Sequence, residues 1–223
     1  MTSVCIKEAL GQFLQFLMKF GNQLVVIVGH NIKRYGCYHL LTAALACDMV
    51  DMLRAAIYGF VDTCILFQKH PRSPTSTASE NTIEALYTQC SSQAGSYDPS
   101  EGAQALQVIV VAADISDKTF QENFFSFVSF DCRFSWKPLE RKQVITGCFM
   151  KKAIDSKLHF DTVWQAFNKH KEEGVREVLI QRMAAWSRMR NQDTILKKIC
   201  DYLREKNEKQ EQRSLSEGNL GTE

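Results

Sequence analysis

The opening residues of the chain have the pattern of apolar and polar positions that is typical of a helix. Apolar side chains recur every three or four residues, which places them on one face of an amphipathic helix. These residues are Ile6, Leu10, Phe13, Leu14 and Leu17. A continuous apolar run covers residues 24–28 after Gly21-Asn22, and its β-branched content predicts a parallel strand buried on both faces.

The middle of the chain mixes short helix and strand signals. Helices are predicted at residues 38–47, 49–58 and 83–90, and a strand is predicted at residues 60–67. Asp98, Pro99 and Glu101 have the order of an N-cap, a first-turn proline and a capping-box acid, so a helix is predicted from there to about residue 113. Residues 120–134 contain six Phe and are predicted to be a buried irregular segment or a helix.

From Lys137 onward the pattern is helical throughout. Helices are predicted at residues 139–154, 161–170, 174–188 and 193–208, with Pro138 in the first turn of the first one. The polar residues 207–223 are predicted to be a disordered tail. We therefore expect an α/β fold, with a sheet-containing domain at residues 1–115 and an aromatic segment plus helical extension at residues 116–206.

Composition is that of an ordinary globular protein. Of the 223 residues, 45% are hydrophobic and 23% are charged. The longest apolar runs, such as residues 108–113, are too short to span a bilayer, so no membrane partner is expected. The eight cysteines are spread singly without zinc-ligand spacing, which favours buried free thiols in a reducing compartment.

Charge is unevenly distributed along the chain. Residues 1–136 carry nine Lys/Arg and twelve Asp/Glu. Residues 137–213 carry eighteen Lys/Arg and eleven Asp/Glu, so their net charge is +7. Because the basic residues alternate with Glu at helical spacing, we favour a solvated helical surface. A basic surface that binds nucleic acid or an acidic partner is the alternative.

The stretch Val25-Val26-Ile27-Val28-Gly29-His30-Asn31-Ile32-Lys33-Arg34-Tyr35-Gly36 is the main candidate for chemistry. It resembles the second motif of the DEDD (ribonuclease H-like) 3′–5′ exonucleases, in which a strand ends in such a turn. The resemblance implies a truncated ribonuclease H-like sheet with flanking helices. In that family four carboxylates hold two metal ions about 4 Å apart.

The resemblance predicts a role for several residues of this turn. The family's metal-binding Asp follows the aromatic residue, and Gly36 stands there in this chain. The resemblance implies nucleic-acid contacts for His30, Asn31, Lys33 and Arg34. The simpler interpretation of His30 is a strand-end residue that is hydrogen-bonded to backbone.

The other two exonuclease motifs are missing or altered. No Asp-x-Glu occurs anywhere, and few residues precede the turn, so the chain is expected to be truncated relative to the family. The third motif falls near Tyr97, where Gly102 replaces Asp in the His-type alignment. Glu101 takes the Asp position in the Tyr-type alignment.

The remaining acids do not complete a catalytic set. Asp98 and Glu101 are better explained as helix caps. Asp62 lies in a Val-Asp-Thr strand that is similar to one in the family, where it is not a ligand. Asp62, Asp98 and Glu101 are the residual candidates, and we expect no catalytic residues, no bound metal and no cofactor.

The order of segments narrows the resemblance. Three segments, taken in order, resemble the C-terminal exonuclease-like domain of the long promyelocytic leukaemia (PML) family isoform and related fish proteins. They are the amphipathic residues 9–17, Ser126-Phe127-Val128-Ser129-Phe130-Asp131-Cys132 and Ile199-Cys200-Asp201-Tyr202-Leu203. That resemblance implies a nuclear or nucleocytoplasmic protein whose nuclease-like domain serves interaction or localisation.

The function expected from these resemblances is a catalytically inactive, exonuclease-like interaction module with weak nucleic-acid binding. Its expected partners are proteins, including PML-type nuclear-body components. The alternative is a metal-dependent 3′–5′ exonuclease, using Mg²⁺ or Mn²⁺, whose first motif is missing from this chain. A third alternative is a fragment that does not fold independently and exposes sheet edges.

Overall fold

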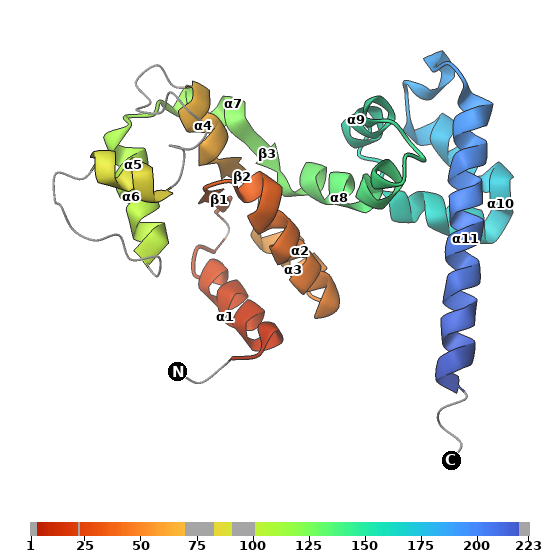
Figure 1. Cartoon of the computed structure of the whole chain (residues 1–223), viewed down its shortest axis with the longest axis horizontal. Coiled ribbons are helices and arrows are strands. Elements are labelled where there is room, and N and C mark those ends of the chain that lie inside the picture. Colours follow the sequence, from red (N-terminus) through yellow and green to blue (C-terminus); the bar gives the residue numbers. More distant parts are fainter. Residues whose placement is uncertain (1–3, 22, 70–82, 91–100, 219–223) are drawn as a thin grey trace. The chain divides into compact units, whose positions relative to one another are not determined.

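The computed structural model describes residues 4–21, 23–69, 83–90 and 101–218 (Figure 1). The chain divides into two compact units, residues 1–127 (unit 1) and residues 128–223 (unit 2). The division lies later than the expected domain boundary after residue 115, because the Phe-rich segment pairs with the sheet of unit 1.

Unit 1 combines a small mixed sheet with short helices. Its described helices are α1 (Ile6–Met18), the π-helical turn η1 (Ile32–Gly36), α2 (Cys37–Ala46), α3 (Val50–Ala56), α4 (Thr63–Lys69), α5 (Ile83–Cys90), α6 (Gly102–Ala112) and α7 (Asp117–Asn123). Its strands are β1 (Val26–Gly29), β2 (Gly59–Asp62) and β3 (Phe124–Ser126). β2 is central, parallel to β1 and antiparallel to β3.

The core of unit 1 forms around β2. All four residues of β2 are buried. The Phe60 ring stacks on Phe125 and Phe127, with centroids 5.5 and 5.8 Å away, so the Phe-rich segment supplies aromatic cover for the central strand. The opening helix buries Leu10, Leu14 and Leu17, as its spacing predicts.

Two strand predictions need correction. The run at residues 24–28 was expected to be buried on both faces, yet Val26 and Val28 in β1 are 37% and 40% exposed. The strand expected at residues 60–67 is a strand only to Asp62, and the same apolar run continues as helix α4. A short apolar run does not distinguish a strand from a buried helix by its periodicity.

Unit 2 is helical. Its described elements are α8 (Phe127–Arg141), α9 (Gly147–Asp155), α10 (Phe160–Arg182), the 3-10 turn η4 (Trp186–Arg188) and α11 (Gln192–Gly218). Trp136 is fully buried and packs edge-to-face against Phe149 and Phe160. Its indole N–H donates to the carbonyl of Leu158 at 2.6 Å, so the ring is both packed and hydrogen-bonded.

The helix predicted at residues 139–154 is wrong, because α8 ends at Arg141 and α9 begins only at Gly147. Pro138 lies in the last turn of α8 instead of opening a helix. The expected break between residues 170 and 174 is confirmed, since His170 and Lys171 have non-helical backbone angles inside α10. Gly174 follows that break, and a Cβ there would lie 2.5 Å from the carbonyl oxygen of Ala166, so the close approach requires glycine.

The structure also corrects the expected tail. The sequence predicts disorder for residues 207–223, but α11 continues to Gly218. The extension is rich in Glu and Gln, which have good helix propensity, and Lys209 pairs with Glu205 one turn earlier. Residues 219–223 lie outside the described residues. Among the described helices, none is both long and apolar enough to cross a membrane.

Glycine substitutions test the packing of the sheet. A Cβ at Gly59 would lie 2.4 Å from the Phe124 ring and 2.6 Å from the Phe125 carbonyl oxygen. We expect Gly59→Ala to destabilise the chain by about 1–3 kcal/mol, because β2 and β3 must separate to make room. Urea unfolding followed by circular dichroism measures this change.

The matched control for that variant is Gly11→Ala in α1. A Cβ at Gly11 meets no atom within 4 Å. Its expected effect is stabilisation by roughly 0.5–1 kcal/mol, since alanine loses less backbone entropy than glycine in a helix. Equal effects of the two substitutions would contradict the described packing of β2 against β3.

Candidate functional site

The predicted turn lies where the two parallel strands end. The register places Gly29 of β1 opposite Asp62 of β2, so the residues that follow both strands meet at one edge of the sheet. Asn31 adopts a left-handed conformation (φ 54°, ψ 26°), which Asn tolerates better than most residues, and η1 begins directly after it. The structure thus brings His30 and Lys33 close to Asp62, which lies 29 positions after Lys33 in the sequence.

Asp62 forms the centre of this turn. It is only 3% exposed, and its Oδ2 accepts a hydrogen bond from the backbone N–H of Lys33 at 3.0 Å. Its Oδ1 accepts from the backbone N–H of Cys64, also at 3.0 Å, which is an N-cap interaction for α4. Both carboxylate oxygens therefore hold protein backbone in place.

The negative charge of Asp62 also influences a neighbouring thiol. Cys37, the first residue of α2, is 1% exposed. Burial raises the pKa of Cys37 to about 12, and the charge of Asp62 contributes in the same direction. The Cys37 thiol is therefore protonated at neutral pH and acts as a small apolar core residue.

His30 belongs to the same scaffold. Its Nδ1 lies 3.1 Å from the hydroxyl of the fully buried Thr63, and its ring stacks on Phe67 with centroids 6.4 Å apart. This contact is with a side chain, and the backbone partner expected for His30 stays a prediction. The contact ties the end of β1 to the start of α4.

The cations of the turn lie at the surface. Lys33 and Arg34 are exposed. The Lys33 ammonium lies 5.2 Å from the centroid of Phe125, and the Arg34 guanidinium lies 5.3 Å from that of Tyr35. Two positive charges beside aromatic rings can attract an anion and stack on a planar group.

Of the degenerate motif positions, Gly36 and Gly102 are described by the structure. A Cβ at Gly36 would lie 2.9 Å from Cγ1 of Ile32, so the family's Asp would fit only if Ile32 moved. Glu101 is exposed, and its side chain forms no capping hydrogen bond to α6, which begins at Gly102. Tyr97 and Asp98 lie outside the described residues. Across residues 4–21, 23–69, 83–90 and 101–218, no three His, Cys, Asp or Glu side chains are grouped to hold a metal ion.

A second feature of unit 1 is a groove beside the exposed face of β1, which we call the apolar groove. Its volume is about 490 Å³. It is lined by Val26, Val28, Tyr58, Val61, Phe120, Gln121 and Phe124. Tyr58, which is 49% exposed, stacks on Phe124 with centroids 5.2 Å apart. The sequence did not reveal this groove, and the alternate valines of β1 are its only local signal.

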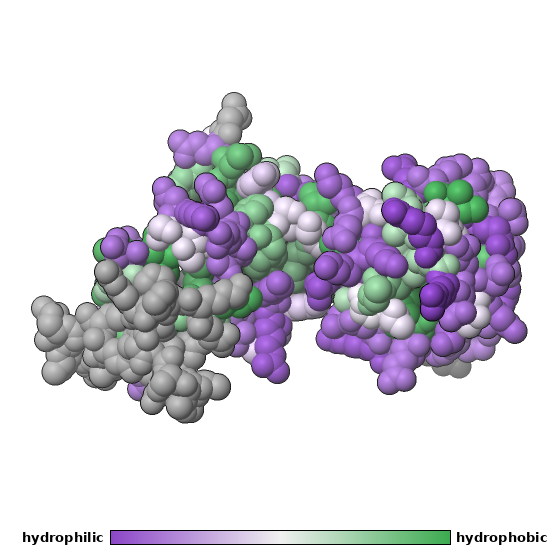
Figure 2. All heavy atoms as spheres, turned by 90° about the horizontal axis from the view of Figure 1, so that it is seen from above, coloured by the Kyte–Doolittle hydropathy of each residue, from purple (hydrophilic) through white to green (hydrophobic). Residues whose placement is uncertain are grey.

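The surfaces of the two units differ in polarity. Figure 2 shows larger apolar (green) areas over unit 1 and mainly polar (purple) side chains over unit 2. On the face shown, unit 1 therefore presents more apolar contact area, and unit 2 presents mainly polar side chains.

Fold and surface together define a two-part protein, with a small α/β unit that has an apolar groove and a helical unit with a charged surface. Residues 132–206, which form most of unit 2, match the family model of the PML C-terminal domain. The chain is PML-like over this region. No curated protein and no solved structure matches the chain. The exonuclease resemblance of unit 1 stays a prediction.

The role of Asp62 can be measured. Asp62→Ala removes the acceptor of two backbone N–H groups, and we expect it to lower the free energy of unfolding by about 2–3 kcal/mol. Urea unfolding of the full chain provides the measurement. Asp51→Ala is the control, because this Asp is 92% exposed and pairs only with the nearby Arg54 among its described salt bridges. Its expected effect is within about 0.5 kcal/mol. If Asp62→Ala leaves the free energy of unfolding unchanged, the carboxylate does not hold the turn.

Proposed function

We propose that this chain is a catalytically inactive, exonuclease-like interaction module of a PML-like nuclear protein. The observation that carries the proposal is the arrangement around Asp62. The one acid at the end of the parallel strands uses both oxygens to accept backbone hydrogen bonds. Its role is to preserve the strand and turn of the scaffold.

The geometry of the turn supports the absence of nuclease chemistry. A two-metal mechanism needs several carboxylates converging on ions about 4 Å apart. At the turn, Ile32 occupies the space that a side chain at position 36 would need. The parallel pair β1–β2, which ends in this turn, supports a ribonuclease H-like origin for the scaffold.

The apolar groove supports a protein partner. Exposed contiguous apolar surface in a folded protein marks interaction sites, and aromatic side chains often dominate the binding free energy. Tyr58 and Phe124 form such an aromatic pair beside Val26 and Val28. Nuclear localisation, with partners among PML-type nuclear-body proteins, is proposed from the match of residues 132–206. The cations of the turn add weak affinity for nucleic acid to the proposal.

A nuclease assay tests the catalytic part of the proposal. The full chain is incubated with end-labelled single-stranded DNA and Mg²⁺ or Mn²⁺, beside a variant carrying Asp98→Asn and Glu101→Gln, since Asp62 has a structural role. We expect no metal-dependent shortening of the DNA by either protein. Shortening by the parent chain that disappears in the variant would establish the alternative, a metal-dependent 3′–5′ exonuclease.

A crosslinking experiment tests the interaction part. We expect Val28→Asp to reduce, by at least about tenfold, the recovery of proteins crosslinked to the chain in nuclei, because a charge in the apolar groove must be desolvated when a partner binds. Quantitative mass spectrometry of the crosslinked proteins is the measurement. Met52→Asp, at another exposed apolar position, is the control. If both variants recover the same partners as the parent, the apolar groove is not the interaction surface.

A further inference from the structure

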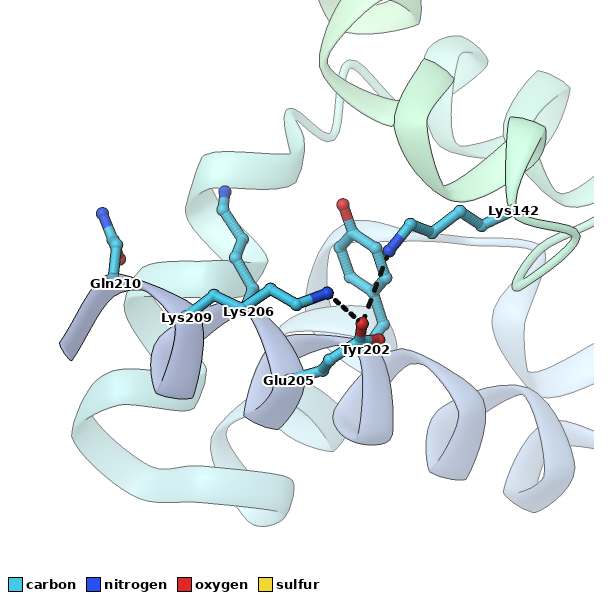
Figure 3. A pocket seen from close by; sticks show the side chains of 6 residues that line it. All are labelled: Lys142, Tyr202, Glu205, Lys206, Lys209 and Gln210. Carbon is cyan, nitrogen blue, oxygen red and sulfur yellow. Dashed lines mark hydrogen bonds and ion pairs between the residues drawn. The ribbon is translucent and has the colours of Figure 1, made fainter. Parts of the chain in front are cut away.

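Unit 2 has a pocket lined by three lysines, which we call the lysine pocket. It is lined by Lys142, Tyr202, Glu205, Lys206, Lys209 and Gln210, and its volume is about 300 Å³ (Figure 3). Five of these residues share one face of α11, at positions i, i+3, i+4, i+7 and i+8. Lys142 reaches the pocket from the segment after α8.

The charge of the pocket is positive after its internal ion pairs are formed. Glu205 pairs with Lys209 and, at 3.8 Å, with Lys142. The hydrogen bond from Lys209 and the charge of Lys142 lower the pKa of Glu205, so this carboxylate is ionised at neutral pH. Three ammonium groups against one carboxylate leave a net charge of +2.

Lys206 is the lysine that the internal pairs do not neutralise. Its ammonium lies 3.4 Å from the centroid of Trp164 and 5.4 Å from that of Phe160. In the part of unit 2 whose side chains are described, no ion pair involves Lys206. Burial lowers its pKa, while the charge of Asp161 acts in the opposite direction. An anion bound beside Lys206 would offset the cost of desolvating this ammonium.

The pocket also contains neutral hydrogen-bonding groups. Burial and the charge of Glu205 raise the pKa of Tyr202, so its phenol is protonated at neutral pH and can donate a hydrogen bond. The ammonium of Lys142 lies 5.1 Å from the centroid of the Tyr202 ring. Figure 3 shows Lys142 and Lys209 directed toward Glu205, whereas Lys206 and Gln210 extend away from it.

We propose that the lysine pocket binds an anionic side chain, a carboxylate or a phosphorylated hydroxyl, on a peptide segment of a partner protein. The neighbouring charges favour a peptide over nucleic acid. A phosphate backbone requires a continuous basic track, whereas the same helix also presents the exposed acids Asp201, Glu208 and Glu211. One anionic group bound in the pocket can contact the lysines there without approaching these neighbouring acids. The site is on unit 2 and does not depend on the apolar groove.

The experiment uses the full chain and three fluorescein-labelled glycine–serine peptides that differ only at the central residue, which is phosphoserine, glutamate or serine. Fluorescence anisotropy gives the dissociation constants. We expect the phosphoserine and glutamate peptides to bind, and the serine peptide to bind at least about tenfold more weakly. A single-stranded oligonucleotide is a further arm.

Charge-removing variants connect this binding to the pocket. Lys142→Met and Lys206→Met should each raise the dissociation constant of the phosphoserine peptide about tenfold. Lys206→Arg keeps the positive charge, so its dissociation constant should equal that of the parent chain. Lys151→Met, at an exposed position on α9 outside the pocket, is the control and should leave it unchanged. Lys142 is about half exposed, so its removal tests the pocket even if a Lys206 variant does not fold.

Several outcomes would overturn the proposal. These are no saturable binding of either anionic peptide up to about 5 mM, equal binding of the serine peptide, or unchanged binding by both Lys→Met variants. Tighter binding of the oligonucleotide with the same dependence on Lys142 would assign the pocket to nucleic acid instead. Val28→Asp in the apolar groove should leave peptide binding unchanged, so failure at one site is distinguishable from failure at the other.

Discussion

The hydrogen bonds accepted by Asp62 determine how unit 1 is organised. One carboxylate holds the start of η1 through Lys33 and the start of α4 through Cys64, so the connections after both parallel strands are fixed at the same point. His30 and Cys37 take their places around it, the first against Thr63 and the second as a protonated thiol in the core. A buried charge is tolerated here because charge-assisted hydrogen bonds replace its hydration.

The hydrogen bonds of Asp62 give the turn a structural role that requires no metal ion. A catalytic carboxylate must leave its oxygens available for metal ions and must converge with other acids. A carboxylate that caps a helix and orders a loop contributes to folding directly. Selection for stability alone is therefore sufficient to maintain the strand, the turn and the acid.

Local patterns in the sequence predicted the helices better than the sheet. The face formed by Leu10, Leu14 and Leu17 repeats within one helix, so its periodicity is visible without tertiary information. The three-residue strand β3 could not be predicted in this way, since it forms only by pairing with β2, more than sixty residues earlier. The contact of His30 with Thr63 likewise depends on the parallel register of β1 and β2. The apolar groove collects side chains from distant segments, so only the fold reveals it.

The exposed valines of β1 have a consequence for the amount of protein in a cell. A partner that covers Val26 and Val28 binds the folded state and not the unfolded chain, so its binding free energy adds to the stability of unit 1 in proportion to the logarithm of its concentration. The unfolded fraction, which proteases remove, then falls as the partner accumulates. The level of this chain would therefore follow the level of its partner, without any change in synthesis.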